Sequence, residues 1–391
     1  MQNRFYSYLK TTELILASYK GDQPFVFYTK AYFNQHKKHG SKDRKMILSL
    51  CYAYFRMGKA FNKLTIEEKI KIGFFICNES PKDFTALFPR NFIENWKSQL
   101  DKRIQFIDKL YPEFKNTLFP FFEELGAISD CGRFIESHFV QPNLFLRVRP
   151  NQNEIVIKKL QDSPISYQLM NKNCIAINNT TKVDELVSIN NEVVVQDYSS
   201  QSVEEFMLIV KENLSETIQL WDCCAASGGK TILAKDIFKD LKITVSDTRA
   251  SILQNLKKRF KEAGIHQFTS FVADVAKPIE TKKTYNFIIC DVPCSGSGTW
   301  SRTPEQISFF SKEKIEDYYQ LQCLIANNAL KSLGNNGYFL YITCSVFKKE
   351  NEDVVEKILK NNSIELVSSK YFEGFTLQAD TMFAALFKKV K

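Results

Sequence analysis

The spacing of hydrophobic residues predicts helices in the first third of the chain. Up to about residue 138, apolar side chains recur at intervals of three and four, as in Ile47, Leu50 and Cys51. This is the period of an amphipathic helix that buries one face, so we predict an all-helical domain at residues 1–138. A Gly-Ser-Lys-Asp turn precedes one helix, and Ser41 is expected to be the N-cap of that helix, which runs through Tyr54.

The pattern changes between residues 139 and 201. Short apolar runs at 144–148 and 192–197 are typical of strands, and residues 154–160 are typical of a short helix. We therefore predict a small α+β linker domain at residues 139–201.

From residue 202 to residue 391, short apolar runs alternate with longer amphipathic segments. Strands separated by helices favour parallel pairing with helices on both faces of one sheet. We therefore expect an α/β, Rossmann-like domain with a doubly wound, mostly parallel sheet. The predicted strands are 217–222, 242–246, 269–272, 285–290 and 337–343, and the predicted helices are 230–239, 251–263, 312–332 and 351–359.

Composition narrows the class of protein. A chain of 391 residues with 44% hydrophobic content can form two or three folded domains. No apolar run reaches the roughly 18 residues of a membrane helix, and the first ten residues do not have the layout of a signal peptide. Ten cysteines without a secretion signal indicate free thiols in a reducing compartment, and Cys-x-x-Cys is absent. We expect a cytoplasmic monomer that binds no metal ion and no membrane.

Positive charge is concentrated near the N-terminus. The net charge is +9, and residues 1–60 hold eleven Lys or Arg against three acidic residues, which gives +8. A basic segment with aromatic residues before it attracts a polyanion such as RNA. A solvated helix face has the same composition, so the sequence leaves both interpretations open. The candidate RNA-binding residues are Lys37, Lys38, Lys42, Arg44 and Lys45.

A glycine turn follows the predicted strand that ends at residue 222. Residues 222–231 read Asp-Cys-Cys-Ala-Ala-Ser-Gly-Gly-Lys-Thr. Glycines between a strand and a helix let backbone amides approach a ligand at the positive end of the helix. The turn is not a P-loop, because a cysteine occupies the position of that motif's first glycine. The predicted cofactor loop consists of Cys224, Ala225, Ala226, Ser227, Gly228, Gly229 and Lys230.

Acidic residues follow the next two predicted strands. Asp247 is placed to accept hydrogen bonds from ribose hydroxyls, and Asp274 to accept from an adenine amino group. Such residues are also common turn formers. An acid after each of three successive strands, Asp291 being the third, favours a nucleotide-type cofactor.

Two cysteines stand in unlike contexts, each after a predicted strand. Cys294 lies in Asp-Val-Pro-Cys-Ser-Gly, and Cys344 lies in Thr-Cys-Ser. The carboxyl ends of parallel strands meet at the edge where ligands bind, so we expect covalent catalysis beside a cofactor. Buried cysteine is often a small hydrophobic residue, and we expect this of Cys51, Cys77, Cys223, Cys290 and Cys323.

These motifs, in this order over about 190 residues, resemble the signatures of the Sun/Fmu (RsmB-type) RNA cytosine-5 methyltransferases. Glu-Asn-Glu at 350–352, Arg302, Pro304 and the Val-Gln-Asp-Tyr-Ser-Ser-Gln segment at 195–201 also fit. Residues 40–56 are similar to the NusB-like helical domain of the RsmB branch, which methylates small-subunit ribosomal RNA. The resemblance implies a class I methyltransferase domain, S-adenosyl-L-methionine as cofactor and ribosomal RNA as partner. One departure is Ser227, which stands where the family has proline and puts the affinity for the cofactor in question.

The resemblance also assigns roles to single residues. Cys344 would attack carbon 6 of cytosine, so that carbon 5 can take up the methyl group. Cys294 would assist loss of the carbon-5 proton and release of the product. Asp291 would hydrogen-bond ring nitrogen 3 and the amino edge, and donation to nitrogen 3 requires a proton and hence a raised pKa. Lys230 would lie beside the cofactor and the target; its other interpretation is a solvated cation on a helix.

Three alternatives remain at this stage. The substrate could be another RNA such as tRNA. A DNA cytosine-5 or amino-group methyltransferase fits less well, because DNA enzymes use the Pro-Cys cysteine alone and amino-group enzymes carry Asp/Asn-Pro-Pro-aromatic. A non-enzymatic RNA-binding protein of ribosome assembly predicts decay of the catalytic residues, whereas Asp291, Cys294 and Cys344 are all present.

Overall fold

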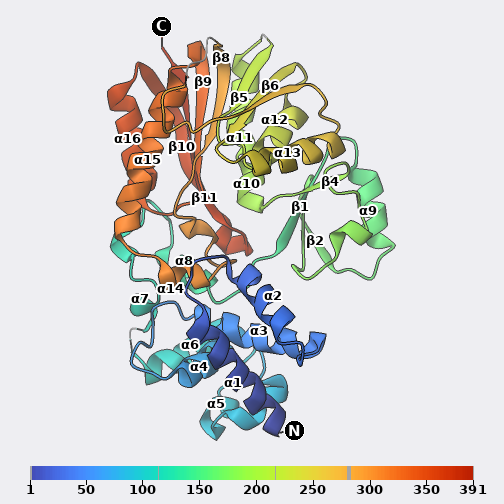
Figure 1. Cartoon of the computed structure of the whole chain (residues 1–391), viewed down its shortest axis with the longest axis vertical. Helices are drawn as coiled ribbons and strands as arrows, with labels where there is room; N and C mark the ends of the chain where they lie inside the picture. Colours follow the sequence, from blue (N-terminus) through green and yellow to red (C-terminus); the bar gives the residue numbers. More distant parts are fainter. Residues whose placement is uncertain (1, 113, 216, 280–282, 391) are drawn as a thin grey trace. The chain divides into compact units, whose positions relative to one another are not determined.

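The structure is a computed structural model that describes residues 2–112, 114–215, 217–279 and 283–390 (Figure 1). The chain divides into two compact units. The first consists of the residues up to Glu123, Asp130–Gln141 and Trp300–Ser311, and the second holds the rest. The predicted division into three domains has different boundaries and stays a prediction. Within the described ranges, no helix is both long and apolar enough to cross a membrane.

The first unit is helical, as the spacing predicts. Aromatic side chains fill its core, where Phe25 packs on Tyr19 and Phe55 at ring-centroid distances of 5.0 and 4.9 Å. The buried Arg56 donates to the carbonyl oxygen of Ser301 (3.1 Å), which ties the distant segment 300–311 to this unit. Its α-helices are α1 (Gln2–Ser18), α2 (Phe25–Gln35), α3 (Ser41–Phe55), α4 (Ile66–Cys77), α5 (Arg90–Glu94), α6 (Leu100–Leu110), α7 (Phe114–Leu118), α8 (Cys131–Ser137) and α14 (Glu305–Phe309).

One detail of the sequence-based prediction is wrong: Ser41 is the first residue of α3, and Gly40 is the N-cap. The Asp43 carboxylate accepts a hydrogen bond from the Gly40 N–H (3.0 Å), which satisfies the cap from the third helical position. An acidic residue in the first turn also interacts favourably with the helix dipole.

The second unit begins with a small antiparallel sheet of order β2-β3-β1-β4. Its strands are β1 (Leu144–Val148), β2 (Tyr167–Asn171), β3 (Cys174–Ile177) and β4 (Val193–Val195). The helix α9 (Asn153–Gln161) covers it through the buried Val156 and Leu160. The strands expected at 144–148 and 192–197 and the helix expected at 154–160 are present as β1, β4 and α9, whereas a separate linker domain at residues 139–201 stays a prediction.

The larger sheet of the second unit has the order β10-β11-β9-β8-β5-β6-β7. Neighbours from β9 to β7 pair in parallel, whereas β11 runs antiparallel to both β9 and β10. The doubly wound, mostly parallel sheet is therefore confirmed, with an antiparallel pair at one edge. Its strands are β5 (Ile218–Asp222), β6 (Leu241–Asp247), β7 (Phe268–Val272), β8 (Tyr285–Asp291), β9 (Leu333–Thr343), β10 (Ile364–Glu373) and β11 (Thr381–Lys389).

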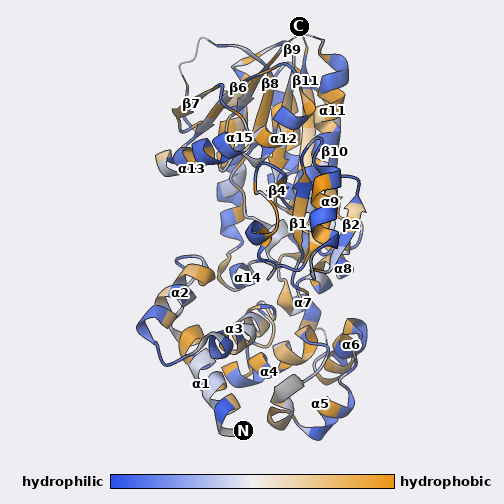
Figure 2. Ribbon diagram, turned by 90° about the vertical axis from the view of Figure 1, so that its right-hand side faces the viewer, coloured by the Kyte–Doolittle hydropathy of each residue, from blue (hydrophilic) through white to orange (hydrophobic). Residues whose placement is uncertain are grey.

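Helices cover both faces of this sheet. On one face, α15 (Glu313–Leu330) and α16 (Glu352–Asn361) pack on Trp221 and Phe339. On the other, α11 (Glu204–Asn213) and α12 (Gly229–Ile237) pack on Leu220 and Phe287. Figure 2 shows the contrast between the hydrophobic strand β8 and the largely hydrophilic surface of α13 (Ala250–Glu262). Burial of each apolar helix face against the strands stabilises the carboxyl edge of the sheet, where the glycine turn and the two cysteine turns begin.

Shorter elements complete the chain. The helix α10 (Tyr198–Ser202) precedes α11. The 3-10 helices are η1 (Lys82–Leu87), η2 (Phe122–Glu124), η3 (Val183–Glu185), η4 (Ser297–Thr299), η5 (Lys348–Glu350) and η6 (Gly374–Leu377).

Candidate active site

The glycine turn lies between β5 and α12, as the sequence predicts. Gly228 has φ = +82°, and a Cβ atom added there would lie 2.5 Å from Cε1 of Phe260. Only glycine fits both the backbone angle and the space. Ala226 also has a positive φ, +44°, which is uncommon for a residue with a Cβ. The turn thus brings the first amides of α12 to the carboxyl edge of the sheet, where they are suited to an anionic or polar ligand.

The acids at the ends of the strands line one cavity of about 420 Å³. Asp247, Asp274 and Asp291 all contribute to its wall, together with both Cys294 and Cys344. Asp247 is also part of the loop structure, because its carboxylate accepts from the Ala226 N–H at 3.1 Å. The structure therefore brings together residues that the sequence separates by about 100 positions.

Cys294 and Cys344 are in direct contact. Their Sγ atoms are 3.2 Å apart, at the ends of β8 and β9. The hydrogen bond with Cys344 and burial both raise the pKa of the Cys294 thiol well above its usual value. Cys294 therefore keeps its proton at neutral pH. By contrast, Cys223 and Cys290 are fully buried in the apolar core, as expected for small hydrophobic residues.

The two cysteine turns are joined by a buried carboxylate that the sequence analysis recognised only as part of a signature. Glu350 is 0% exposed, and its Oε2 accepts from the Ser295 N–H (2.9 Å) and from Nε2 of Gln322 (2.8 Å). Its Oε1 accepts from Oγ of Ser345 (2.6 Å). Ser295 follows Cys294 and Ser345 follows Cys344, so Glu350 sets the position of one cysteine against the other. A charged residue soon after Thr-Cys-Ser was the available signal.

Lys230 is not the solvated cation of the alternative interpretation, because it is only 7% exposed. Its Nζ donates to Oγ of Ser200 (2.8 Å) and to Oδ2 of Asp291 (3.1 Å). An ammonium and a carboxylate are thus presented side by side at the end of β8. Ser200 comes from the 195–201 segment, which explains the position of that segment in the site.

A second cavity, of about 280 Å³, adjoins this pair. It shares Asp291 and Cys344 with the first cavity, and Lys230, Thr299 and Met382 also line it. Two neighbouring compartments therefore meet at Asp291 and Cys344. Such an arrangement has room for two different molecules, each with access to the cysteine.

Asp222 is a further residue of this region that the sequence analysis did not assign to the site. It lines the second cavity, is 1% exposed and accepts from Oγ1 of Thr231 at 2.6 Å. Its other oxygen has no partner among the residues that the structure describes. Burial raises the pKa of Asp222 to about 7. Its place at the end of β5, directly before the glycine turn, was the signal.

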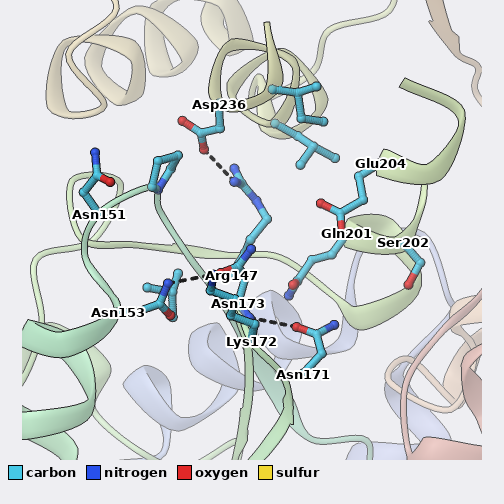
Figure 3. Close-up of a pocket in the computed structure, with 14 residues that line it drawn as sticks. Arg147, Asn151, Asn153, Asn171, Lys172, Asn173, Gln201, Ser202, Glu204 and Asp236 are labelled. Atoms are coloured by element: carbon cyan, nitrogen blue, oxygen red, sulfur yellow. Dashed lines mark hydrogen bonds and ion pairs between the residues drawn. The ribbon is translucent and has the colours of Figure 1, made fainter. Parts of the chain in front are cut away.

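The helix that begins at the glycine turn is anchored at its other end. Figure 3 shows Asp236 of α12 above the guanidinium of Arg147, a residue of β1. Arg147 Nη1 lies 2.5 Å and Arg149 Nη2 lies 2.6 Å from the Asp236 carboxylate. These side chains are largely buried, so the ion pairs are well shielded from water. The small sheet therefore fixes the helix that begins at the glycine turn.

The candidate RNA-binding residues lie in the helical unit and fall into two groups. Arg44 is half-buried, donates from Nε to the carbonyl oxygen of His39 (2.8 Å) and lies over the Phe33 ring. It therefore has a structural role. The four exposed lysines are Lys37, Lys38, Lys42 and Lys45.

Among the described residues, no group of three His, Cys, Asp or Glu side chains is placed to hold a metal ion.

Comparison with known proteins places this site in a family. Residues 207–387 match the family model of 16S rRNA methyltransferase RsmB/F. The 26S rRNA (cytosine-C(5))-methyltransferase nsun-5 of Caenorhabditis elegans is 36% identical over 146 residues, which are 36% of this chain and 33% of that protein. The probable ribosomal RNA small subunit methyltransferase B of Coxiella burnetii is 28% identical over 235 residues, which are 58% of this chain and 52% of that protein. The chain thus spans about half or less of these relatives' length.

Solved structures agree on the fold. The crystal structure of PH0851 has a TM-score of 0.68 at 18% identity and covers 97% of both chains. A methyltransferase homolog protein from Pyrococcus horikoshii has a TM-score of 0.58 at 18% identity, over 72% of this chain and 97% of that one. The second unit therefore has a Rossmann-like methyltransferase fold with a mixed sheet. The segment matched by the family model contains the glycine turn, the acids at the strand ends and both cysteines, so over residues 207–387 this chain is similar to the RsmB/F family of rRNA methyltransferases.

Proposed function

We propose that the protein is an RNA cytosine-5 methyltransferase that acts on small-subunit ribosomal RNA. The observation that carries this proposal is the contact of Cys294 and Cys344, 3.2 Å apart, where two cavities meet. A single nucleophile would account for one cysteine. Two cysteines at one point fit a reaction that first forms and later breaks a bond to the base.

The residues around the first cavity suit S-adenosyl-L-methionine. Gly228 allows the tight turn that the loop makes against Phe260, and Asp247 and Asp274 in the wall of the cavity offer acceptors for ribose hydroxyls and an adenine amino group. When bound, this cofactor supplies an electrophilic methyl group. The protein's part is to direct that group toward the point that Asp291 and Cys344 share between the two cavities.

The thiols divide the work between them. By the resemblance to the family, Cys344 attacks carbon 6, and Cys294, whose pKa is raised by contact with Cys344 and by burial, is suited to remain the protonated partner. Attack at carbon 6 makes carbon 5 nucleophilic enough to accept a methyl group. Loss of the carbon-5 proton then expels the Cys344 sulfur, and Cys294 lies within reach of this step.

Lys230 and Asp291 match the polar edge of cytosine. The base presents an amino donor beside the acceptor nitrogen 3, and this pair presents a carboxylate acceptor beside an ammonium donor, 3.1 Å apart. In this arrangement Lys230 can supply the hydrogen bond to nitrogen 3 that the sequence-based expectation required of a protonated Asp291. Charge that develops on the ring during attack would be stabilised by the same ammonium.

The helical unit is proposed to be a NusB-like RNA-binding domain. The exposure of four lysines in one short stretch supports this role, because such side chains neutralise phosphates on binding. We further propose a cytoplasmic monomer. All ten cysteines are free thiols, which suits a reducing compartment, and residues of a single chain line both cavities.

A second candidate substrate is tRNA. The tRNA (cytosine(72)-C(5))-methyltransferase NSUN6 of Mus musculus is 26% identical over 156 residues, which are 36% of this chain and 32% of that protein. Relatives named for rRNA and for tRNA both match part of this chain, so one experiment should distinguish the two substrates.

Bisulfite sequencing of ribosomal and transfer RNA tests the proposal. RNA from cells with the protein, without it, and with the Cys344→Ala variant would be compared. We expect one cytosine of small-subunit rRNA to be methylated only where the intact protein is present. A site in tRNA alone would identify the second substrate. Identical methylation of both RNA classes in all three strains would overturn the assignment.

A further inference from the structure

The cofactor loop has a side-chain contact at the position where it departs from its family. Nη1 of Arg259 donates to Oγ of Ser227 at 2.8 Å and lies 3.4 Å from the Ser227 carbonyl oxygen. By the resemblance of the glycine turn to the family's signature, Ser227 stands where a proline is expected. Within the turn, the Gly228 N–H donates to the Ala225 carbonyl (2.7 Å), the Ala225 N–H donates to the Ser246 carbonyl (2.9 Å) and the Ala226 N–H donates to the Asp247 carboxylate (3.1 Å).

Arg259 is itself held in place. Its Nε donates to Oδ1 of Asn190 (2.7 Å), and Nδ2 of Asn190 donates to Oε2 of Glu262 (2.7 Å). Arg149 fixes Asn190 in turn, by donating from Nη1 to its carbonyl oxygen at 3.0 Å. The guanidinium that reaches the loop therefore belongs to a connected polar network, which continues through Arg149 to Asp236 of α12.

A serine at position 227 allows the backbone of the loop more conformations than a proline would. Proline fixes φ near −65° and so reduces the number of conformations that must be given up when the loop becomes ordered. Here the neighbours Ala226 and Gly228 both have positive φ, so the loop departs from ordinary backbone geometry. A loop that is not held in this shape loses conformational entropy when a ligand binds, which weakens binding.

We propose that Arg259 is a positioning residue that holds the cofactor loop in its binding shape, in the place of the family's proline. The expected effect of Arg259 on cofactor affinity rests on the proposed function, whereas its effect on the shape of the loop is independent of that function. Arg259 lines the second cavity next to Ser227 and Gly229, and the neighbouring Ala226 of the same loop lines both cavities, so a change in the loop's shape would reach the proposed cofactor cavity as well.

The test is a double-mutant cycle between Arg259→Ala and Ser227→Pro. No hydrogen bond from the Ser227 N–H to another described residue is present, so proline at this position removes none of them. Calorimetry with S-adenosyl-L-methionine would measure affinity, and hydrogen–deuterium exchange would follow the peptide that contains residues 223–231. Lys258→Ala is the matched control, because Lys258 is an exposed cation beside Arg259 on the same helix. Melting temperatures would show that each variant is folded.

We expect Arg259→Ala to weaken cofactor binding by about tenfold, since hydrogen bonds to charged groups contribute at this level, and to speed exchange in the loop. In the Ser227→Pro background the same substitution should change both quantities much less. If Arg259→Ala unfolds the protein, Ser227→Ala tests the same contact and should give the same two changes.

Two results would overturn the inference. One is an Arg259→Ala variant that matches Lys258→Ala in affinity and exchange. The other is an effect of equal size with serine and with proline at position 227. If the wild-type protein binds no S-adenosyl-L-methionine, the proposed function fails, while the exchange measurement still decides the role of Arg259.

Discussion

Asp222 is predicted to make the stability of the protein depend on pH. The side chain lies at the end of β5, is 1% exposed and has one carboxyl oxygen without a partner in the described part of the chain. Burial, together with the nearby negative charge of Asp291, raises its pKa from 3.8 to about 7. In the unfolded chain the pKa returns to the ordinary value, so the two states bind different numbers of protons in between.

The direction follows from proton linkage. Between pH 3.8 and about 7 the folded protein keeps the proton on Asp222 and the unfolded chain has lost it. Stability is therefore greatest at low pH and falls as the pH rises through this window. One pKa unit corresponds to about 1.4 kcal/mol, so the whole shift amounts to about 4 kcal/mol, of which roughly 2–3 kcal/mol falls between pH 5 and pH 8.

The perturbation is Asp222→Asn. An asparagine oxygen can still accept from Thr231 Oγ1, and its amide replaces the oxygen that has no partner in the described part of the chain. Urea unfolding at a series of pH values from 5 to 8 gives the free energy of unfolding for wild type and variant. We expect the difference between them to change by about 2–3 kcal/mol over this range, with the variant gaining relative stability as pH rises. Asp317→Asn, at an exposed position, is the matched control and should follow the wild type.

The reasoning about Asp222 is refuted if wild type and Asp222→Asn lose stability in parallel from pH 5 to pH 8. That outcome would mean that the carboxyl group is already ionised in the folded protein, and that water or a conformational change satisfies its second oxygen.

Three further predictions concern the reaction and its ligands. Cys344→Ala should abolish methylation and form no covalent RNA adduct, whereas Cys294→Ala should accumulate a protein–RNA adduct that survives denaturing electrophoresis; the reverse pattern would exchange the two roles. Gly228→Leu should weaken S-adenosyl-L-methionine binding at least roughly tenfold, because φ = +82° and the contact with Phe260 exclude a side chain; calorimetry giving wild-type affinity would contradict this. Neutralising the exposed lysines should reduce the slope of log affinity for RNA against log salt by about 0.7–0.9 for each phosphate that the protein no longer neutralises, and an unchanged slope would identify a solvated face. Arg44 is left out of these substitutions, because Arg44→Gln would remove its hydrogen bond to His39 and is expected to lower the stability of the protein. The lysines to be replaced together are Lys37, Lys38, Lys42 and Lys45.

The secondary structure around the site was predictable because it depends on local patterns. Strand β1 coincides with the predicted residues 144–148, and β8 extends the predicted strand by one residue to Asp291. A strand followed by a turn-forming motif needs no knowledge of distant residues. The last two strands of the chain were missed for a related reason. β10 has mixed burial, and β11 is buried almost throughout between two neighbours, so neither shows the alternation that marks a half-exposed strand.

The contacts between residues of the candidate site cannot be predicted from local sequence patterns. Glu350 was visible in the sequence only as part of a signature, and nothing local indicated that it joins Ser295 to Ser345. Likewise, the sequence did not distinguish Arg44 from the neighbouring lysines. In the folded protein Arg44 contacts His39 and Phe33, whereas the lysines are exposed. Whether a charged side chain is buried or exposed is decided by what packs over it.

The sequence by itself therefore determined which chemical groups end the central strands: a glycine turn after β5, an acid after β6, and a cysteine after each of β8 and β9. Only the tertiary structure decided which of them meet. Cys294 and Cys344 are 50 positions apart, Lys230 and Asp291 are 61 apart, and Ser227 and Arg259 are 32 apart. Such pairs form because the order β9-β8-β5-β6 lays strands from distant parts of the chain side by side, and strand order is set by the burial of whole faces rather than by any single stretch of residues.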